Sequence, residues 1–217
     1  MLTTKALTQP TIVAGTTLIL SGAAQASIVF TLEPGSPDFP AVTSAGGTGQ
    51  AALSSETKDG VTLTVTAAGG NGVIAASVNG DDGFGVAGNA SFDLNGNESF
   101  SLTFDQDVFI DQLSFDVFSF GESVDISIPS LAISTNVTGN QTFTPAIAGI
   151  AAAGNANGDF TLNFNDQGFE LSAGEAIIVT TTSSILVDSV SVTLVPEPGS
   201  LALASCALAL FARRRHG

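Results

Sequence analysis

The chain has 217 residues, of which 20 are acidic and only 5 are basic, and its formal net charge is −15 at pH 7. Residues 27–198 hold all 20 acids and a single base, Lys58, so this segment alone has a formal charge of −19. Such a segment repels phosphate backbones, which excludes nucleic acid as an expected partner. The only cysteine and the only histidine lie beyond residue 200, so the same segment has no disulfide and no imidazole or thiolate chemistry.

Residues 1–26 have the composition of a secretory signal peptide. One positive charge precedes a moderately apolar stretch that ends at Ala24. Ala24 and Ala26 form the small-x-small pattern that signal peptidase cleaves, so we expect the mature chain to begin at Ser27. An N-terminal membrane anchor is the alternative, which the threonines in so short a stretch disfavour.

Apolar residues alternate with polar ones through residues 27–194, which is the pattern of half-buried β-strands. The clear runs are Ile28–Leu32, Val61–Val65, Ile74–Val78, Phe100–Phe104, Leu113–Val117, Val124–Ile128, Phe160–Phe164 and Val190–Leu194. Clusters of Gly, Asn and Asp separate many of the runs, and these residues close hairpins readily. Many short strands at regular spacing predict an all-β fold, an antiparallel β-sandwich with jelly-roll-like connections.

Two segments of the body lack this alternation. Residues 34–50 are rich in Pro, Gly and Ser, and residues 144–157 form a run rich in Ala and Gly. Both are predicted to be loops, with a helical turn from Ile147 to Ala153 as an option in the second. Residues 104–108, Phe-Asp-Gln-Asp-Val, predict a tight reversal between two strands that send their aromatic side chains inward.

Asp81, Asp82 and Asp188 are the candidate metal ligands. Carboxylates in Gly- and Asn-rich turns suit Ca²⁺, which takes oxygen ligands. If Val190 and Val192 face the core, strict alternation also turns Asp188 inward, where a buried carboxylate needs a partner. A calcium ion would supply that partner. The alternatives are a local bulge that turns Asp188 outward, or hydrogen bonds from nearby backbone amides.

The C-terminal residues combine three features in a fixed order. These are a Pro-Glu-Pro motif at Pro196, Glu197 and Pro198, an apolar helix at 201–212, and a basic cluster at Arg213, Arg214 and Arg215. By the positive-inside rule the arginines stay in the cytoplasm, which leaves the acidic body outside the membrane. The apolar segment is shorter than the ~20 residues of a comfortable spanning helix, so an unprocessed tail anchor that thins the bilayer is the alternative.

This order of features resembles the PEP-CTERM sorting tail of certain Gram-negative bacteria. The resemblance covers residues 195–215, and parts of residues 80–195 are more weakly similar to the bodies of other members. It implies that the Pro-Glu-Pro motif is recognised by exosortase, an integral membrane, transpeptidase-like enzyme that cuts near it. The implied organisation is a signal peptide at 1–26, a β-sandwich domain at 27–194 and a sorting tail at 195–217.

The expected function is that of an exported, exosortase-processed protein with a structural or adhesive role. The chain would be transiently anchored in the membrane and would then reach the cell surface or extracellular matrix, where its acidic surface would bridge through divalent cations to acidic polysaccharide. A carbohydrate-binding module, with stabilisation by calcium as an option, is the alternative, although the body has no Trp or Tyr to stack on sugars. A carboxylate-based glycoside hydrolase is the remote alternative. No enzymatic activity is expected, because the body lacks His and Cys.

Overall fold

The computed structural model describes most of the predicted body. The described residues are 26–33, 36–39, 53–69, 73–78, 81–86, 98–116, 122–138, 142–144, 146–154, 159–164, 169–181 and 185–196. Within these ranges the chain forms fifteen β-strands and one short 3₁₀-helix, and no α-helix. The predicted all-β fold is confirmed.

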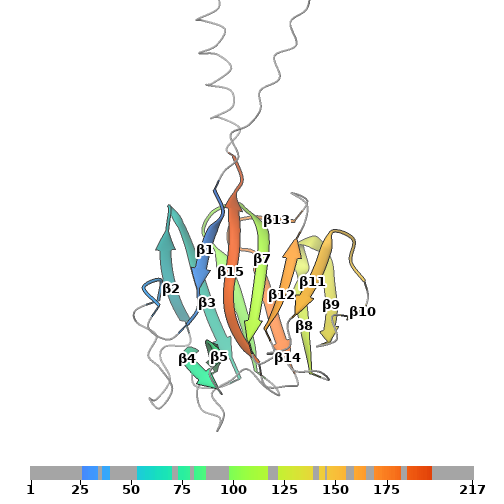
Figure 1. Ribbon diagram of the computed structural model, residues 1–217. Coiled ribbons are helices and arrows are strands. Elements are labelled where there is room, and N and C mark those ends of the chain that lie inside the picture. The colour runs from blue at the N-terminus through green and yellow to red at the C-terminus, as the bar shows by residue number, and fades with distance from the viewer. Residues whose placement is uncertain are drawn as a thin grey trace, which may run out of the picture.

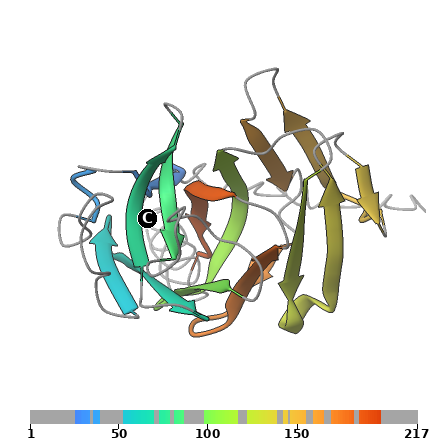
Figure 2. The ribbon, with the colours of Figure 1, turned by 90° about the horizontal axis from the view of Figure 1, so that it is seen from below.

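The strands form two antiparallel sheets that lie face to face as in a β-sandwich (Figures 1 and 2). The eight-stranded sheet has the order β11 (Ile150–Gly154), β12 (Phe160–Phe164), β7 (Val108–Asp116), β15 (Leu186–Leu194), β5 (Asp81–Val86) and β4 (Val73–Val78), with β1 (Ile28–Thr31) beside β15 and β13 (Glu170–Leu171) beside β7. The seven-stranded sheet has the order β10 (Thr142–Thr144), β9 (Ile133–Thr138), β8 (Ser123–Ile128), β14 (Ala176–Thr181), β6 (Ser99–Phe104), β3 (Val61–Ala68) and β2 (Leu53–Lys58).

The alternation of apolar and polar residues builds these strands. In β3, Val61, Leu63 and Val65 are buried, while the threonines between them are partly exposed. β6 repeats the pattern with Phe100 and Phe104 among its buried residues. Because successive side chains of a strand point to opposite faces, one face of each strand enters the core and the other meets water. Each of the predicted runs overlaps a strand.

The chain passes from one sheet to the other many times between β1 and β15. The predicted reversal at residues 104–108 is one such passage, because β6 belongs to the seven-stranded sheet and β7 to the eight-stranded sheet. Asp105 fixes the start of this passage. Its backbone N–H donates to the Thr62 carbonyl at 3.1 Å, and its side-chain Oδ1 accepts from the Thr62 N–H at 2.6 Å. These two bonds hold the end of β6 to β3, its neighbour in the seven-stranded sheet, before the chain crosses to β7.

Phenylalanine fills much of the space between the sheets. Among the largest fully buried side chains are Phe30, Phe84, Phe100, Phe104, Phe115 and Phe160. The rings of Phe30 on β1 and Phe104 on β6 lie 6.2 Å apart and join the two sheets across the core. Burying a Phe side chain stabilises a fold by roughly 1.5–3 kcal/mol. Residues 27–198 contain no cysteine, so no disulfide adds to this packing.

The two longest strands, β7 and β15, are neighbours in the eight-stranded sheet (Figure 1). Each also pairs with two shorter strands: β15 with β1 and β5, and β7 with β12 and β13. Two register shifts interrupt the β7–β15 pairing, one between Val187 and Ser189 and one between Ser191 and Val192. Bulges of this kind break the two-residue period of the side chains.

Both predicted loops contain ordered, packed residues. The loop predicted for 144–157 is wrong at Ile150–Gly154, which forms β11 and pairs with β12. Ile150 and Ala152 pack against the core while Ala151 and Ala153 are exposed, but alanine on both faces hides this two-residue period in the sequence. In the segment 34–50, residues 36–39 are described, and Phe39 is buried with its ring 5.2 Å from that of Phe84.

Candidate functional site

The first and last strands of the body are hydrogen-bonded neighbours. β1 and β15 pair antiparallel, with Ile28 opposite Val192 and Thr31 opposite Ser189. Antiparallel pairing places the start of one strand beside the end of the other. The two ends of the described chain, Ala26 and Pro196, therefore leave the sandwich at the same end, as Figure 1 shows. We call β1 and β15 the terminal strand pair.

A polar cluster fastens the beginning of the terminal strand pair. Ser27 Oγ donates to Asp111 Oδ2 at 2.6 Å and lies 2.5 Å from Ser191 Oγ. Thr193 Oγ1 also donates to Asp111 Oδ2, at 2.8 Å. Asp111 belongs to β7, so one carboxylate holds Ser27, which directly precedes β1, and Thr193 of β15 against the middle of the sheet. Ser27, the residue expected at the mature N-terminus, is therefore already held by the fold.

The exit from β15 is held in a similar way. The Val195 N–H donates to the Asp107 carbonyl at 3.0 Å, just past the end of the strand. Asp107 also accepts a hydrogen bond from the Ala173 N–H on its Oδ1 at 2.8 Å. The backbone is therefore still attached to the body at Val195, and the next residue, Pro196, begins the predicted sorting motif.

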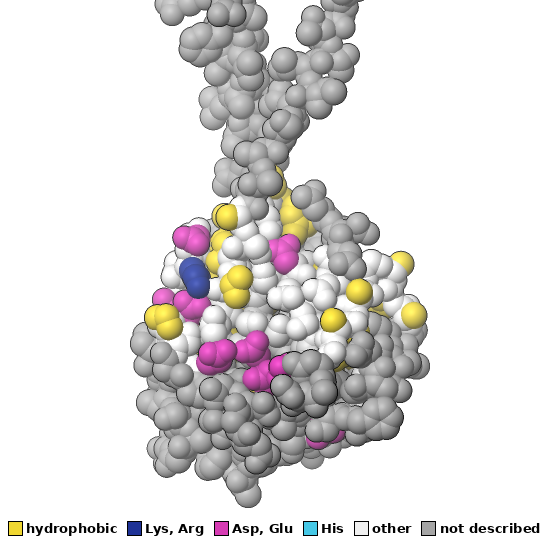
Figure 3. All heavy atoms as spheres, viewed as in Figure 1, with side chains coloured by type: hydrophobic (Ala, Val, Ile, Leu, Met, Phe, Trp, Pro, Cys, Tyr) yellow, Lys and Arg dark blue, Asp and Glu magenta, His cyan; other side chains and the backbone are white. Residues whose placement is uncertain are grey.

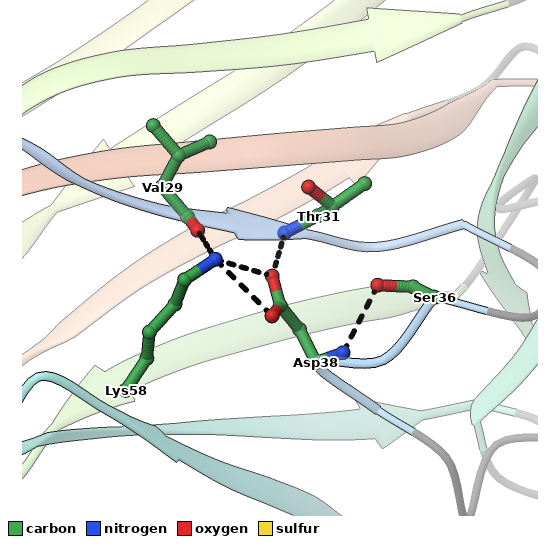
Figure 4. A network of polar contacts seen from close by, with 5 residues as sticks. All are labelled: Val29, Thr31, Ser36, Asp38 and Lys58. Atoms are coloured by element: carbon green, nitrogen blue, oxygen red, sulfur yellow. Dashed lines mark hydrogen bonds and ion pairs between the residues drawn. The ribbon is translucent and has the colours of Figure 1, made fainter.

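Lys58 links the terminal strand pair to the other sheet (Figure 4). It ends β2, and its Nζ donates to the Val29 carbonyl on β1 at 2.7 Å. The same Nζ lies 3.0 and 3.1 Å from the two carboxylate oxygens of Asp38. Asp38 in turn accepts from the Thr31 N–H at 2.9 Å, and its own N–H donates to Ser36 Oγ. We call Lys58, Asp38 and the β1 backbone that they hold the lysine clasp.

The lysine clasp uses the only basic residue of the described chain. Figure 3 shows a single dark-blue patch on this face, with acidic side chains beside it. The Asp38 side chain is 12% exposed and the Lys58 side chain 37% exposed, so the pair lies partly out of water. Burial of that degree makes each ion dependent on the other. The one cation of the body is therefore committed to a structural contact with β1.

Several other acids also accept hydrogen bonds from the backbone. The Ser172 N–H donates to Glu175 Oε2 at 3.0 Å. Glu175 therefore accepts a backbone hydrogen bond through its side chain, as Asp105 and Asp107 do. The charge pattern alone did not predict these structural roles. Their sequence signal is the position of the acid directly after a strand or in a short turn, where backbone amides lack ladder partners.

Asp188, one of the candidate calcium ligands, lies at the first register shift of β15. It is partly buried, and β15 does not alternate strictly there, because Leu186 and Val187 are both buried. Its Oδ2 accepts from Ser189 Oγ at 2.9 Å, and its carbonyl accepts from the Leu32 N–H at 2.7 Å. The inward orientation of the Asp188 side chain was predicted from strict two-residue alternation along the strand. The bulge interrupts that alternation, so the prediction no longer follows from it.

The strand that carries the other two candidates is a neighbour of β15. Asp81 and Asp82 begin β5, which pairs with β15 through Phe84 opposite Val187. The topology therefore brings the backbones of all three aspartates to one sheet, while the side chains of Asp81 and Asp82 lie outside the described part. Among the described residues no group of three or more acidic, His or Cys side chains is arranged to hold a metal ion. The calcium site stays a prediction.

The remaining predicted sorting residues lie outside the described residues. These are Ala24 of the cleavage pattern, Glu197 and Pro198 of the motif, the apolar segment 201–212 and Arg213, Arg214 and Arg215. Within the described ranges, no helix is both long and apolar enough to cross a membrane. Comparisons with protein-family models, with curated proteins and with solved structures find no significant match to the chain.

Proposed function

We propose that this chain is an exported protein of the cell surface or extracellular matrix, processed at both ends, with a structural or adhesive role. The observation that carries the proposal is the position of the terminal strand pair. β1 begins two residues after Ala26, and β15 ends two residues before Pro196. Both predicted processing sites therefore adjoin the body without entering it, and they adjoin it at the same end.

Processing at these sites would leave the described core complete. Every buried apolar residue of the described chain lies between Ile28 and Val192. Cleavage by signal peptidase after Ala26, and by exosortase near Pro196, Glu197 and Pro198, would remove no residue that packs there. A chain held in the membrane by its C-terminal segment would present the sandwich as one unit on the outer side of the bilayer, with Arg213 to Arg215 retained inside.

A structural role fits the chemistry of the body better than catalysis does. The body has no His and no Cys, and several of its acids are engaged by backbone amides or by Lys58. We further propose jelly-roll-like connections, which the repeated passage of the chain between two antiparallel sheets supports. The organism is proposed to be a bacterium with an exosortase, the enzyme that the tail would require.

A second candidate function is a carbohydrate-binding module, and the outer face of the seven-stranded sheet favours it. This face carries rows of hydroxyl side chains on neighbouring strands. The rows include Ser55, Thr57, Thr62, Thr64, Thr66, Ser101 and Thr103. Hydroxyls both donate and accept hydrogen bonds, as sugar hydroxyls do. Saturable binding to sugars on a glycan array would support this candidate. No binding to any sugar on the array would contradict it, and only the structural role would remain.

The proposed sorting is tested in a bacterium that has an exosortase and in its deletion strain. We expect the wild-type strain to yield protein that begins at Ser27 and ends near Pro198. The deletion strain is expected to retain the C-terminal segment, with the protein in the membrane fraction. Identical C-termini in the two strains would contradict exosortase processing, and an uncut N-terminus would contradict export.

A further inference from the structure

Asp111 lies at an irregular point of β7. Its neighbours Ile110 and Gln112 pair with consecutive residues of β15, so Asp111 is the extra residue of a β-bulge. Asp111 and Gln112 are accordingly both partly exposed, although strict alternation would bury one of them. The bulge therefore keeps the Asp111 carboxylate at the surface of the eight-stranded sheet, where it meets Ser27.

No cationic side chain contacts the Asp111 carboxylate in the described part of the chain. Both of its described hydrogen bonds come from hydroxyl groups, those of Ser27 and Thr193, and both reach Oδ2. Lys58, the single basic residue of the described ranges, pairs with Asp38 in the lysine clasp. The partners that the structure gives to Asp111 are therefore neutral.

Cleavage of the chain after Ala26 would create a positive charge at this place. The peptide nitrogen of Ser27 is uncharged in the precursor and becomes an α-ammonium group when the preceding residue is removed. The nitrogen and Oγ of one serine are three bonds apart, so they lie within about 4 Å of each other. Because Ser27 Oγ is 2.6 Å from Asp111 Oδ2, the ammonium would lie within about 6 Å of that oxygen, where opposite charges attract.

We propose that removal of the predicted signal peptide fastens the fold, because the ammonium group that it creates on Ser27 pairs with Asp111. This inference rests on the proposed cleavage after Ala26. The new pair holds the start of β1 to β7, while the lysine clasp holds the same strand to β2 at the Val29 carbonyl. The mature chain therefore has two cations that hold β1, whereas the precursor has one, and β1 is fully secured only after export.

The pair gives the mature chain a characteristic pH dependence. An α-amino group ordinarily titrates at about pH 8, and a neighbouring carboxylate raises its pKa in the folded chain. The stabilisation is therefore present in full below about pH 7.5 and is lost as the pH rises through the raised pKa. Carboxyl groups and lysine ordinarily titrate well outside this range, near about pH 4 and about pH 10.4. The other charged side chains on the described segments around β1 and the exit of β15 are Glu33, Asp38, Glu56, Lys58, Asp107 and Asp188.

Hydrogen exchange of β1 in two matched chains tests the pair. Both chains run from Ser27 to Gly217 and are purified in detergent, one with a free amino group and one with an acetylated amino group. Acetylation removes the charge and leaves an amide at this nitrogen, as in the precursor. At about pH 7 we expect residues 28–32 to exchange about two- to fivefold faster in the acetylated chain, the range that exposed ion pairs give. Above about pH 9.5 the difference should disappear, because the ammonium loses its proton.

Two aspartate variants show whether Asp111 is the partner. Asp111→Asn can still accept the hydroxyl hydrogen bonds but has no charge, so we expect acetylation to leave exchange unchanged in this variant. Asp188→Asn is the matched control, because the Asp188 carbonyl accepts from the Leu32 N–H just past the other end of β1. In the control, acetylation should keep its two- to fivefold effect.

Two results would overturn the proposal. One is equal exchange in the free and acetylated chains at about pH 7, and the other is an acetylation effect that persists in Asp111→Asn. The pH series uses the unaltered sequence, so it decides the question even where a variant does not fold. Failure of the cleavage is distinguishable from failure of the pair, because a mature chain from cells that begins at another residue contradicts cleavage after Ala26 without changing the exchange of the Ser27 chain.

Discussion

Gly83 tests whether β5 packs against β15 as described. A Cβ at this position would lie 2.7 Å from Leu186 Cβ and 3.0 Å from the Val187 carbonyl oxygen. Carbon atoms in contact are separated by ~3.5–4.0 Å, so Gly83→Ala must move the two strands apart by about 1 Å. Leu186 and Val187 are fully buried, and neither neighbouring atom belongs to the flexible end of a side chain.

The expected cost follows from that overlap. Overpacking a core typically destabilises a protein by about 1–3 kcal/mol. Replacing glycine also restricts the unfolded chain, which stabilises the folded state by roughly 0.4–1 kcal/mol. We therefore expect Gly83→Ala to lower the free energy of unfolding by about 1–2 kcal/mol, which corresponds to a fall in Tm of about 2–8 °C for a body of this size. Urea unfolding of residues 27–196, followed by circular dichroism, measures the free energy of unfolding.

Gly60→Ala is the control for this substitution. Gly60 has no atom within 4 Å of a new Cβ, but its φ of +83° strains any residue with a side chain. Both variants should lose stability, yet only Gly83→Ala should speed hydrogen exchange at the β5–β15 contact. A Gly83→Ala protein as stable as the unaltered one, with unchanged exchange at Val187, would mean that β5 does not pack on β15 in this register.

Three further predictions concern the lysine clasp, the candidate metal site and the sorting motif. Lys58→Met should lower the free energy of unfolding, measured by urea denaturation, by about 1–2 kcal/mol, because Asp38 and the Val29 carbonyl lose their charged partner. Lys58→Arg keeps the charge and should lose less stability than Lys58→Met, whereas equal losses in the two variants would point to packing rather than charge. Millimolar Ca²⁺ should raise the Tm if Asp81, Asp82 and Asp188 bind it, and Asp188→Asn should remove the rise; no rise in the unaltered body would end the calcium hypothesis. Replacing Pro196, Glu197 and Pro198 by alanine should leave the C-terminal segment uncut in an exosortase host, and normal cleavage of that variant would contradict the motif assignment.

The sequence predicted the strands better than it predicted their partners. Alternation in β3 and β6 follows from the pleat itself, so the local pattern is sufficient there. β11 was not predicted because alanines lie on both of its faces, so the sequence does not show its two-residue period. At residues 104–108 the sequence could not distinguish a crossing between two sheets from a hairpin within one sheet. Whether successive strands join the same sheet depends on distant partners, which no local window contains.

The candidate site illustrates the same limit. The position of Asp188 at a bulge depends on how β15 pairs with β7, and a two-residue period read along β15 alone cannot show it. The lysine clasp joins Lys58 to an aspartate 20 positions earlier in the chain, through a loop whose composition gave no hint of order. The boundaries of the body stay predictions, with β1 beginning two residues after Ala26 and β15 ending two residues before Pro196.

We propose that cleavage on both sides of the terminal strand pair releases an intact acidic sandwich outside the cytoplasm. Mass spectrometry of the protein recovered from the envelope and medium of an exosortase-bearing bacterium tests it most directly. We predict a polypeptide that starts at Ser27, stops close to Pro198 and lacks Arg213 to Arg215. Recovery of the whole chain from Met1 to Gly217 in the cytosol, with neither end cut, would contradict the account.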